Sequence, residues 1–370
     1  MGKTVFKIKR LVNTASDKNP PHGKNPLNKG ENVTLRKDKI HQYHEENRLC
    51  ILKPIIDKLV LRFDPLKNMT IGKKKSFRTY VAKHLKTECY TEVTEEENNQ
   101  KPGRYKNYKG NHWLHCEGIN ERILVQTRPK KGNLPFFRFD LNPARLGAKG
   151  VNLFKKELEN LFNIDVYGLG YKDVLAYEKA VQRFDVAVDV LGVDISDLEI
   201  IFVKKHGNQK QPVKSVIYHS ETKRDQTDYP NALSDSGSNI YVYNKKAEAQ
   251  DKNKPVLYGG VLHTRYEHRY TDKNKSLAKA LNISPGNNPL RKVDLRWVNY
   301  KAIKNKDHSH VLFLQYCKAR GLSKALEVIP TKDKSDYEDT YHIAMTDIWH
   351  PEKMWSHWPN VLKASGLLSE

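Results

Sequence analysis

Hydrophobic and polar residues alternate most regularly in residues 183–190, RFDVAVDV. Phe or Val occupies every second position, and the face between them carries Arg183, Asp185, Ala187 and Asp189. A period of two is typical of a β-strand with one face in a core. Asp is uncommon in strands, so we expect these two acids to bind a metal or to position a substrate. Solvated acids on a half-exposed edge strand are the alternative.

A second alternating segment, residues 238–248, has the sequence SNIYVYNKKAE. Tyr241 and Tyr243 share one face of the predicted strand, and Lys245 and Lys246 follow directly. Tyrosine has an ordinary pKa of about 10, so it needs nearby positive charge or a metal to act as a nucleophile near neutral pH. The pattern predicts that Tyr243 attacks a phosphodiester and stays attached to it, with Tyr241 and Tyr229 as alternative nucleophiles.

The third segment is residues 262–270, LHTRYEHRY, in which Arg265, Glu267 and Arg269 alternate with tyrosine and histidine. A carboxylate between two arginines on one strand face predicts an ordered polar site. The alternative is a surface ladder of ion pairs, which adds little stability. If the three strands are neighbours, Asp185, Asp189 and Glu267 gather the oxygen ligands that Mg²⁺ or Mn²⁺ prefers.

The remaining periodicity predicts an α+β fold, with a central, mainly antiparallel β-sheet and flanking helices. Residues 1–50 hold eleven Lys or Arg and little apolar periodicity, which predicts a loosely ordered basic arm. A catalytic domain over residues 51–285 and a mainly helical region over residues 286–370 follow. Strands are expected at 59–63, 113–117, 122–127 and 135–141, a hairpin at 199–203 with 213–219, and helices at 151–162, 171–182, 275–281 and 311–329.

Charge points to the partner. The chain of 370 residues has a formal net charge of +22 and a pI near 9.6, which favours a polyanion such as nucleic acid. Residues 72–78 predict a basic loop. The phosphate contacts expected are Lys73, Lys74, Lys75 and Arg78 of this loop, together with Arg269. The four cysteines form no CxxC pair, and no apolar run reaches the roughly 18 residues of a membrane span. We therefore expect a cytoplasmic protein.

In this chemistry the metal would polarise the scissile phosphate, and Lys245, Lys246 and Arg265 would stabilise the charge that develops on it. The attack leaves a phosphotyrosine and a free DNA hydroxyl. Because the energy of the phosphodiester is kept in the new bond, the strand can later be rejoined.

The ordered set RFDVAVD, YVYNKKAE and TRYEHRY resembles the gene II-type replication initiators of filamentous phages and the Rep_trans group of plasmid rolling-circle initiators. Residues 59–62 and 139–146 agree with that layout, so the resemblance covers about residues 51–281. It implies a site-specific, metal-dependent endonuclease that nicks one strand of a double-stranded origin. The link would form to the 5′ phosphate, leaving a 3′ hydroxyl as primer.

Within the family's tyrosine-x-lysine-x-x-glutamate pattern, Tyr243 takes the nucleophile's place, and Asp185 and Glu267 take the acidic positions. The long basic arm departs from the phage pattern. The partners expected are double-stranded origin DNA and single-stranded DNA in a bacterial cytoplasm, with a host helicase and a second copy of the chain as candidate protein partners.

Two other readings remain open. An HUH-type nuclease or relaxase needs two histidines around one hydrophobic residue, and residues 308–310 (HSH) and 112–115 (HWLH) each depart from that pattern. A non-catalytic DNA-binding protein would use its tyrosines to stack on bases and its acids as structural groups.

Overall fold

The structure of the chain is a computed structural model. It describes residues 2–9, 30–45, 48–100, 102–202, 226–229, 239–251, 255–271, 275–303 and 307–368.

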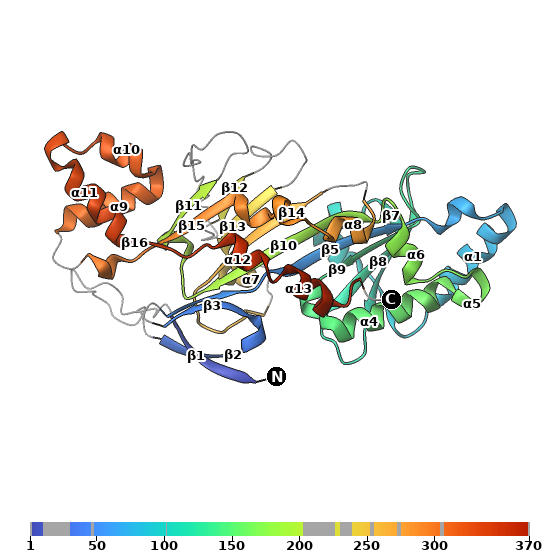
Figure 1. The fold of residues 1–370 in the computed structure, drawn as a ribbon. Coiled ribbons are helices and arrows are strands. Elements are labelled where there is room, and N and C mark those ends of the chain that lie inside the picture. The colour runs from blue at the N-terminus through green and yellow to red at the C-terminus, as the bar shows by residue number, and fades with distance from the viewer. Residues whose placement is uncertain are drawn as a thin grey trace.

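The largest element is an eleven-stranded sheet whose described strand pairs are all antiparallel (Figure 1). This confirms the predicted α+β fold. Along the sheet the order is β12 (Gln226–Tyr229), β13 (Asn239–Asn244), β14 (His263–Tyr270), β10 (Val181–Leu191), β5 (Ile55–Phe63), β9 (Phe137–Leu141), β8 (Arg122–Pro129), β7 (Tyr108–His115) and β6 (Tyr90–Glu92). The other two strands, β3 (Ile40–His44) and β4 (Leu49–Leu52), pair with each other, and β4 also pairs with β10.

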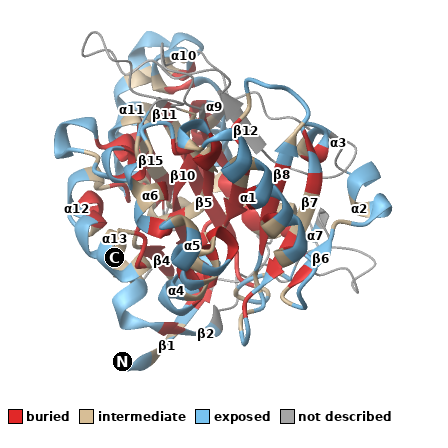
Figure 2. Ribbon diagram, turned by 90° about the vertical axis from the view of Figure 1, so that its right-hand side faces the viewer, coloured by how far each residue is buried: buried red, intermediate tan, exposed pale blue. Residues whose placement is uncertain are grey.

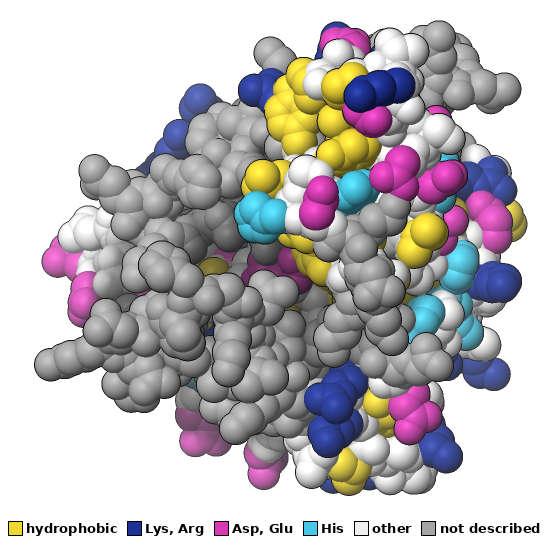
Figure 3. All heavy atoms as spheres, turned by 90° about the vertical axis from the view of Figure 1, so that its left-hand side faces the viewer, with side chains coloured by type: hydrophobic (Ala, Val, Ile, Leu, Met, Phe, Trp, Pro, Cys, Tyr) yellow, Lys and Arg dark blue, Asp and Glu magenta, His cyan; other side chains and the backbone are white. Residues whose placement is uncertain are grey.

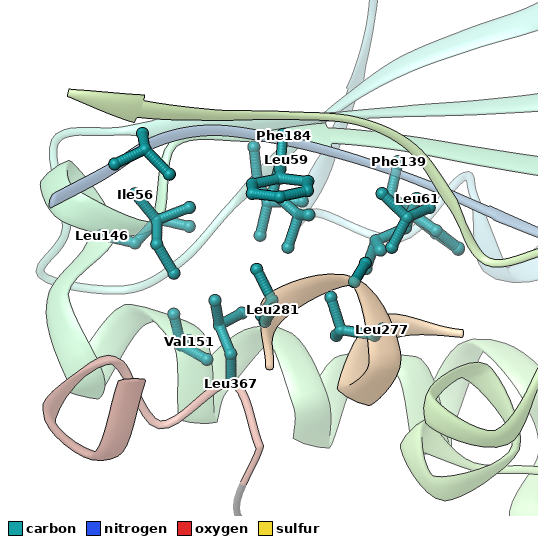
Figure 4. Packing of buried hydrophobic residues seen from close by; sticks show 14 of the residues in the cluster. Ile56, Leu59, Leu61, Phe139, Leu146, Val151, Phe184, Leu277, Leu281 and Leu367 are labelled. Atoms are coloured by element: carbon teal, nitrogen blue, oxygen red, sulfur yellow. The ribbon is translucent and has the colours of Figure 1, made fainter. Parts of the chain in front are cut away.

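One face of this sheet is apolar and is covered by helices. The alternation in β10 turns Phe184 toward the side on which Leu59 of β5 and Phe139 of β9 also lie (Figure 4). Helix α4 (Pro143–Phe162) packs there; it begins with Asn142 as N-cap and Pro143 in its first turn, both common at helix starts. Helix α8 (Leu277–Leu281) adds its leucines to the same core.

The opposite face carries the polar residues of the same strands, and we call it the polar face. Directly opposite residues in antiparallel strands share a face, so the register places Arg269 with Asp185 and Lys58, and Arg138 with Arg62. The central strands β10 and β5 are largely buried (Figure 2). The polar groups there are consequently not solvated as an edge strand would leave them.

Residues 72–78 lie in a helix, not in the predicted loop. Helix α1 (Ile71–His84) starts at the N-cap Thr70, and only Phe77 and Val81 of its side chains are buried. Phe77 packs against Phe136 and Phe137, on the apolar side of the sheet. The prediction failed because these two apolar positions are too few to produce a helical period.

Strands and one short helical turn make up the described parts of residues 1–50, so the loosely ordered basic arm stays a prediction for residues 10–29. Strands β1 (Lys3–Lys9) and β2 (Gly30–Arg36) form an antiparallel pair with Ile8, Val33 and Leu35 buried. Strand β4 crosses the boundary predicted at residue 50 and joins the central sheet. Residues 10–29 lie outside the described residues.

The hairpin predicted for residues 199–203 with 213–219 stays a prediction, because its second strand lies outside the described residues. Strand β11 (Leu198–Phe202) pairs with β15 (Val293–Val298), which also pairs with β16 (Met345–Asp347). Residues 213–219 lie outside the described part of the chain.

The region from residue 286 onward divides between two cores. Helices α9 (His308–Arg320), α10 (Leu322–Glu327) and α11 (Lys334–Ala344) pack around a small core of their own. Figure 3 shows hydrophobic side chains gathered at the top of the face at that end of the molecule. The chain then returns through α12 (Pro351–Trp355) and α13 (Trp358–Ser365) to the main core, where Trp358 Nε1 donates to the Leu281 carbonyl at 2.9 Å. The predicted boundary at 285/286 therefore separates residues that share one core.

The remaining helical segments of the described chain are short. They are η1 (Lys37–Lys39), η2 (Pro65–Asn68), α2 (Glu95–Gln100), α3 (Pro102–Tyr105), α5 (Ile164–Tyr167), α6 (Tyr171–Ala176), η3 (Ile195–Asp197), α7 (Lys245–Asp251), η4 (Pro285–Asn287), η5 (Pro289–Lys292), η6 (Tyr300–Ala302) and η7 (Thr331–Asp333). None of the helices in the described residues has the length and apolar character needed to cross a membrane.

Candidate active site

The three strands that carry the predicted site are adjacent in the sheet, in the order β13, β14 and β10. Tyr243 stands opposite Arg265, which in turn stands opposite Asp189. Tyr241 stands opposite Glu267. The polar side chains of the three strands therefore meet on one face of the sheet.

Tyr243 is buried and makes two polar contacts through its hydroxyl group. The hydroxyl donates to Glu267 Oε2 at 3.0 Å, and Lys245 Nζ donates to the tyrosine oxygen at 3.3 Å. Lys245 also lies 2.7 Å from Glu248, because both are on the first turns of α7, which starts where β13 ends. A hydroxyl, a carboxylate acceptor and an ammonium group thus converge at one oxygen atom.

Burial, and then the negative charge of Glu267, raise the pKa of Tyr243 well above its ordinary value. The hydroxyl is therefore protonated near neutral pH in this arrangement. To act as a nucleophile it must pass its proton to a base during the attack, and Glu267 is already at hydrogen-bond distance.

The alternative tyrosines have different surroundings. The hydroxyl of Tyr241 accepts from Arg269 Nη1 at 2.8 Å, and the guanidinium group of Arg269 stacks on the Tyr241 ring at 4.4 Å. Tyr229 stands opposite Ile240 in β12. The hydroxyl of Tyr243, by contrast, donates to a carboxylate.

Asp185 and Glu267 form a pair of acids between two arginines. Asp185 is 1% exposed and is bonded in bidentate fashion by Arg183, with Arg183 Nε 2.8 Å from Oδ1. Arg183 Nη2 also approaches Glu267 Oε1 at 3.7 Å, and Arg269 donates to the same oxygen at 3.2 Å. Burial raises the pKa of Asp185 to about 7, and the charge of Glu267 adds to that shift.

Asp189 belongs to a separate cluster. Arg265 Nε and Nη2 bond its two oxygens at 2.6 and 2.8 Å, and His263 Nε2 lies 2.9 Å from Oδ1. Arg265 reaches Asp57 as well, at 2.6 Å. Although burial alone would raise it, the charge of Arg265 holds the pKa of Asp189 far below its ordinary value.

This separation changes the predicted metal site. Residues 185 and 189 are four steps apart on one strand, or about 13 Å between Cα atoms, which is too far for both to ligate one ion. Asp185 and Glu267 both contact Arg183 and Arg269, and a pair of acids is enough for Mg²⁺, which is commonly held by one or two carboxylates and keeps water ligands. Burial, with a contribution from the charge of Glu267, raises the pKa of Asp185, and a bound cation would favour its ionised form.

Of the cations predicted for the site, some contact Tyr243 and others lie elsewhere. Lys245 lies at the tyrosine, whereas Lys246 Nζ donates to the Gly260 carbonyl at 3.4 Å. Arg265 is 2% exposed and engaged by two carboxylates, so it is an organising residue of the sheet in this arrangement. Four further predicted DNA contacts lie on α1, which packs on the apolar side of the sheet: Lys73, Lys74, Lys75 and Arg78.

Asp57 is a site residue that the sequence pattern did not reveal, and Arg183 is one to which the sequence analysis gave no role. In β5, Asp57 is an extra residue: Lys58 pairs with Asp185 and Ile56 with Val186, which leaves Asp57 in a β-bulge. Bulges redirect a side chain, and here the carboxylate meets Arg265 two strands away. No alternation marks such a residue, although Arg183 was visible on the polar face of its strand.

The histidine pairs considered for an HUH-type site lie elsewhere. His310, in α9, contacts Asp307 and Asp336 at 2.8 Å each. His115, at the end of β7, contacts Thr91 at 2.8 Å. Neither pair adjoins Tyr243 in the described contacts.

The site is thus a buried tyrosine–glutamate pair beside arginine and lysine side chains on a sheet of mainly antiparallel strands. Neither a scan against protein-family models nor a search of curated proteins finds a match for this chain.

Proposed function

We propose that this protein is a rolling-circle replication initiator that nicks one DNA strand with Tyr243. The observation that supports this most directly is the hydrogen bond from the buried Tyr243 hydroxyl to Glu267, within reach of Lys245. The net charge of +22 favours a nucleic-acid partner.

In the proposed reaction the Tyr243 oxygen forms a bond to phosphorus while the bond from phosphorus to the 3′ oxygen breaks. Glu267 accepts the phenolic proton, and the leaving 3′ oxygen gains a proton to become a hydroxyl. The products are a 5′-phosphotyrosine and a 3′-OH primer. Attack by a 3′-OH on the phosphotyrosine reverses the step and rejoins a strand.

Glu267 is essential to this proposal because the pKa of Tyr243 is raised. A positioned general base contributes roughly 10² to 10⁴ in rate. Lys245, Arg183 and Arg269 are close enough to this pair to offset the negative charge that develops on the phosphate.

The metal in this proposal is Mg²⁺ or Mn²⁺, and Asp185 and Glu267 are the residues that would hold it. Such an ion would polarise the phosphate. The partners proposed are double-stranded origin DNA and the displaced single strand, in the cytoplasm of a bacterial host. A helicase and a second copy of the chain are candidate protein partners.

The test is to incubate the protein with supercoiled plasmid carrying its origin, and with single-stranded DNA from that origin, in Mg²⁺. We expect nicked circles and a covalent adduct, with the DNA attached to the Tyr243 peptide by mass spectrometry. The adduct should be lost in Tyr243→Phe and kept in Tyr241→Phe. Continued adduct formation by Tyr243→Phe would sink the assignment.

A non-catalytic DNA-binding protein is the second candidate, and one observation favours it. Tyr243 is only 8% exposed, as a structural core tyrosine would be. This candidate predicts a gel shift with no adduct in any metal, and Tyr243→Phe would bind DNA as the unaltered protein does.

A further inference from the structure

A cavity of about 150 Å³ opens on the polar face where β5, β8 and β9 meet helix α3. Three guanidinium groups line it, those of Arg62, Arg104 and Arg138. Among the described residues that line this cavity there is no carboxylate. An adjoining cleft of about 320 Å³ shares Arg104 and Arg138 and adds Lys58, Asp140 and Arg183.

Positive charge exceeds negative charge around these cavities. Asp140 is their one described acidic lining residue, and it is shared by Lys58 at 3.0 Å, Arg104 at 3.1 Å and Arg138 at 3.5 Å. Arg183, at the far side, is already bonded to Asp185. The acid therefore leaves most of the surrounding charge uncompensated.

Arg62 is the clearest example of a positive charge in this cavity without a described counter-ion. Its Nε is buried and has no hydrogen-bond partner among the described residues. Burial also lowers the pKa of Arg62. Arg62 is half-buried, and a cation partly removed from water without a counter-ion is costly, so an anion in the cavity would stabilise it.

The site is held rigidly for such an anion. Arg138 Nε donates to Gln182 Oε1 at 3.0 Å, and its Nη1 donates to Gln126 Oε1. The amide of Gln126 in turn donates to Asn111 Oδ1 at 2.6 Å and to the Arg104 carbonyl at 3.2 Å. A guanidinium group fixed in this way, as that of Arg138 is, matches the oxygens of a phosphate and loses little entropy on binding.

The cavity lies on the same face of the sheet as Tyr243. From Glu267, which holds the tyrosine hydroxyl, Arg138 is three strands across and six residue steps along the sheet. Strand spacing and rise make this about 25 Å. That distance corresponds to roughly seven nucleotides of a B-form strand.

We propose that Arg62, Arg104 and Arg138 form a pocket for a backbone phosphate of the DNA strand that Tyr243 cleaves, several nucleotides from the scissile bond. This inference rests on the proposed function for the identity of the strand. The pocket itself is defined by its own residues.

The experiment measures affinity for a fluorescent thymidine 20-mer by anisotropy over a series of salt concentrations. Arg62→Gln is the test variant, since Arg62 has no described partner to lose. Arg320→Gln, which removes the same charge from the exposed end of α9, is the control. Circular dichroism checks that both variants fold.

We expect Arg62→Gln to weaken binding roughly tenfold. The slope of log affinity against log salt should fall by about 0.7, which is one phosphate contact on a single strand. Arg320→Gln should leave both unchanged. Equal salt slopes for the two variants would contradict the proposal that this pocket binds a DNA phosphate.

Two further arms separate the outcomes. Isothermal titration with inorganic phosphate tests whether the pocket binds small phosphates. If Arg62→Gln abolishes phosphate binding but leaves the affinity for the 20-mer unchanged, the pocket is not a DNA-binding site. Binding is measured in a Tyr243→Phe background as well as in the unaltered protein. A loss on Arg62→Gln in both backgrounds supports the pocket even if no covalent adduct is ever found.

Discussion

The hydroxyl of Tyr243, on β13, donates a hydrogen bond to Glu267 on the neighbouring strand β14, and Glu267 is the diagonal neighbour of Tyr243 and not the residue directly opposite. In the register Tyr243 stands opposite Arg265, and Glu267 stands opposite Tyr241. Aromatic side chains are long enough to reach such diagonal neighbours. As a result, the hydroxyl of Tyr243 contacts a carboxylate, whereas the hydroxyl of Tyr241 contacts Arg269. The two tyrosines on one face therefore have different chemical surroundings.

Replacing Glu267 by glutamine should slow covalent adduct formation by about 10² or more, because the general base is lost. Binding of uncleaved DNA should change little. Single-turnover adduct formation and anisotropy measure the two separately. Glu327→Gln, on exposed α10, is the control; an unchanged rate in Glu267→Gln would rule out Glu267 as the base.

Lys245→Met should lower the rate of adduct formation by about tenfold, as the ammonium group near the Tyr243 oxygen is removed. Lys245→Arg should restore part of that rate because it keeps the charge. Lys246→Met should have little effect, since Lys246 bonds the Gly260 carbonyl. Equal losses for both methionine variants would show that the position of the charge is unimportant.

Asp189→Asn should destabilise the protein by about 3 to 5 kcal/mol, the usual cost of breaking a buried ion pair from one side. Asp57→Asn should cost less, because Asp189 still accompanies Arg265. Urea unfolding followed by fluorescence measures both. A stable Asp189→Asn variant that loses metal binding would instead restore Asp189 as a ligand.

The raised pKa of Asp185 predicts how metal binding depends on pH. The protonated acid is favoured below about pH 7, so Mg²⁺ must displace a proton there. Thermal unfolding should therefore show a larger Mg²⁺-dependent rise in Tm near pH 8 than near pH 6. In Asp185→Asn the rise should be small at both pH values, and an undiminished rise would place the ion elsewhere.

The same shift sets the sign of a stability effect without metal. Because the folded pKa lies above the ordinary 3.8, Asp185 contributes stability that is present below pH 4 and lost as the pH rises through 7. Asp189 acts in the opposite direction, with stability lost in acid. The Tm of Asp185→Asn should consequently decline less than that of the unaltered protein between about pH 5 and 8.

The cations of α1 provide a test of the DNA path. Lys73, Lys74, Lys75 and Arg78 are on a helix that packs against the apolar side of the sheet. Their combined replacement by glutamine should reduce DNA affinity mainly at low salt, where long-range attraction is strong. The rate of adduct formation with saturating DNA should stay the same; a large fall in that rate would bring α1 into the active site.

The strands of the site were predictable because apolar and polar residues alternate in each of them with a regular period of two. Residues 183–190 and 262–270 gave β10 and β14 almost to their ends. Their pairing was not predictable, since Arg265 and Asp189 are 76 residues apart in the chain. For the same reason the pairing of β11 with β15 was not predicted.

Side chains gathered from many elements were the least predictable. Arg62, Arg104 and Arg138 come from β5, α3 and β9, and none stands in a charge run that marks a binding site. Metal ligation by Asp189 was inferred from its shared face with Asp185. A shared face shows that two side chains point the same way, but it does not show that they are close. The separation of the two residues along β10 is too long for both to bind one ion.

The bulge at Asp57 has a consequence for changes in chain length. On either side of it β5 keeps its pairing with β10, Lys58 with Asp185 and Ile56 with Val186. Deleting Asp57 would therefore join two halves that already alternate correctly, and every other side chain of β5 would keep its face. We expect the pairing of β5 to survive a one-residue deletion at this position, although inside a regular strand such a deletion turns every following side chain to the other face. The residue is needed for its carboxylate and not for the continuity of the strand.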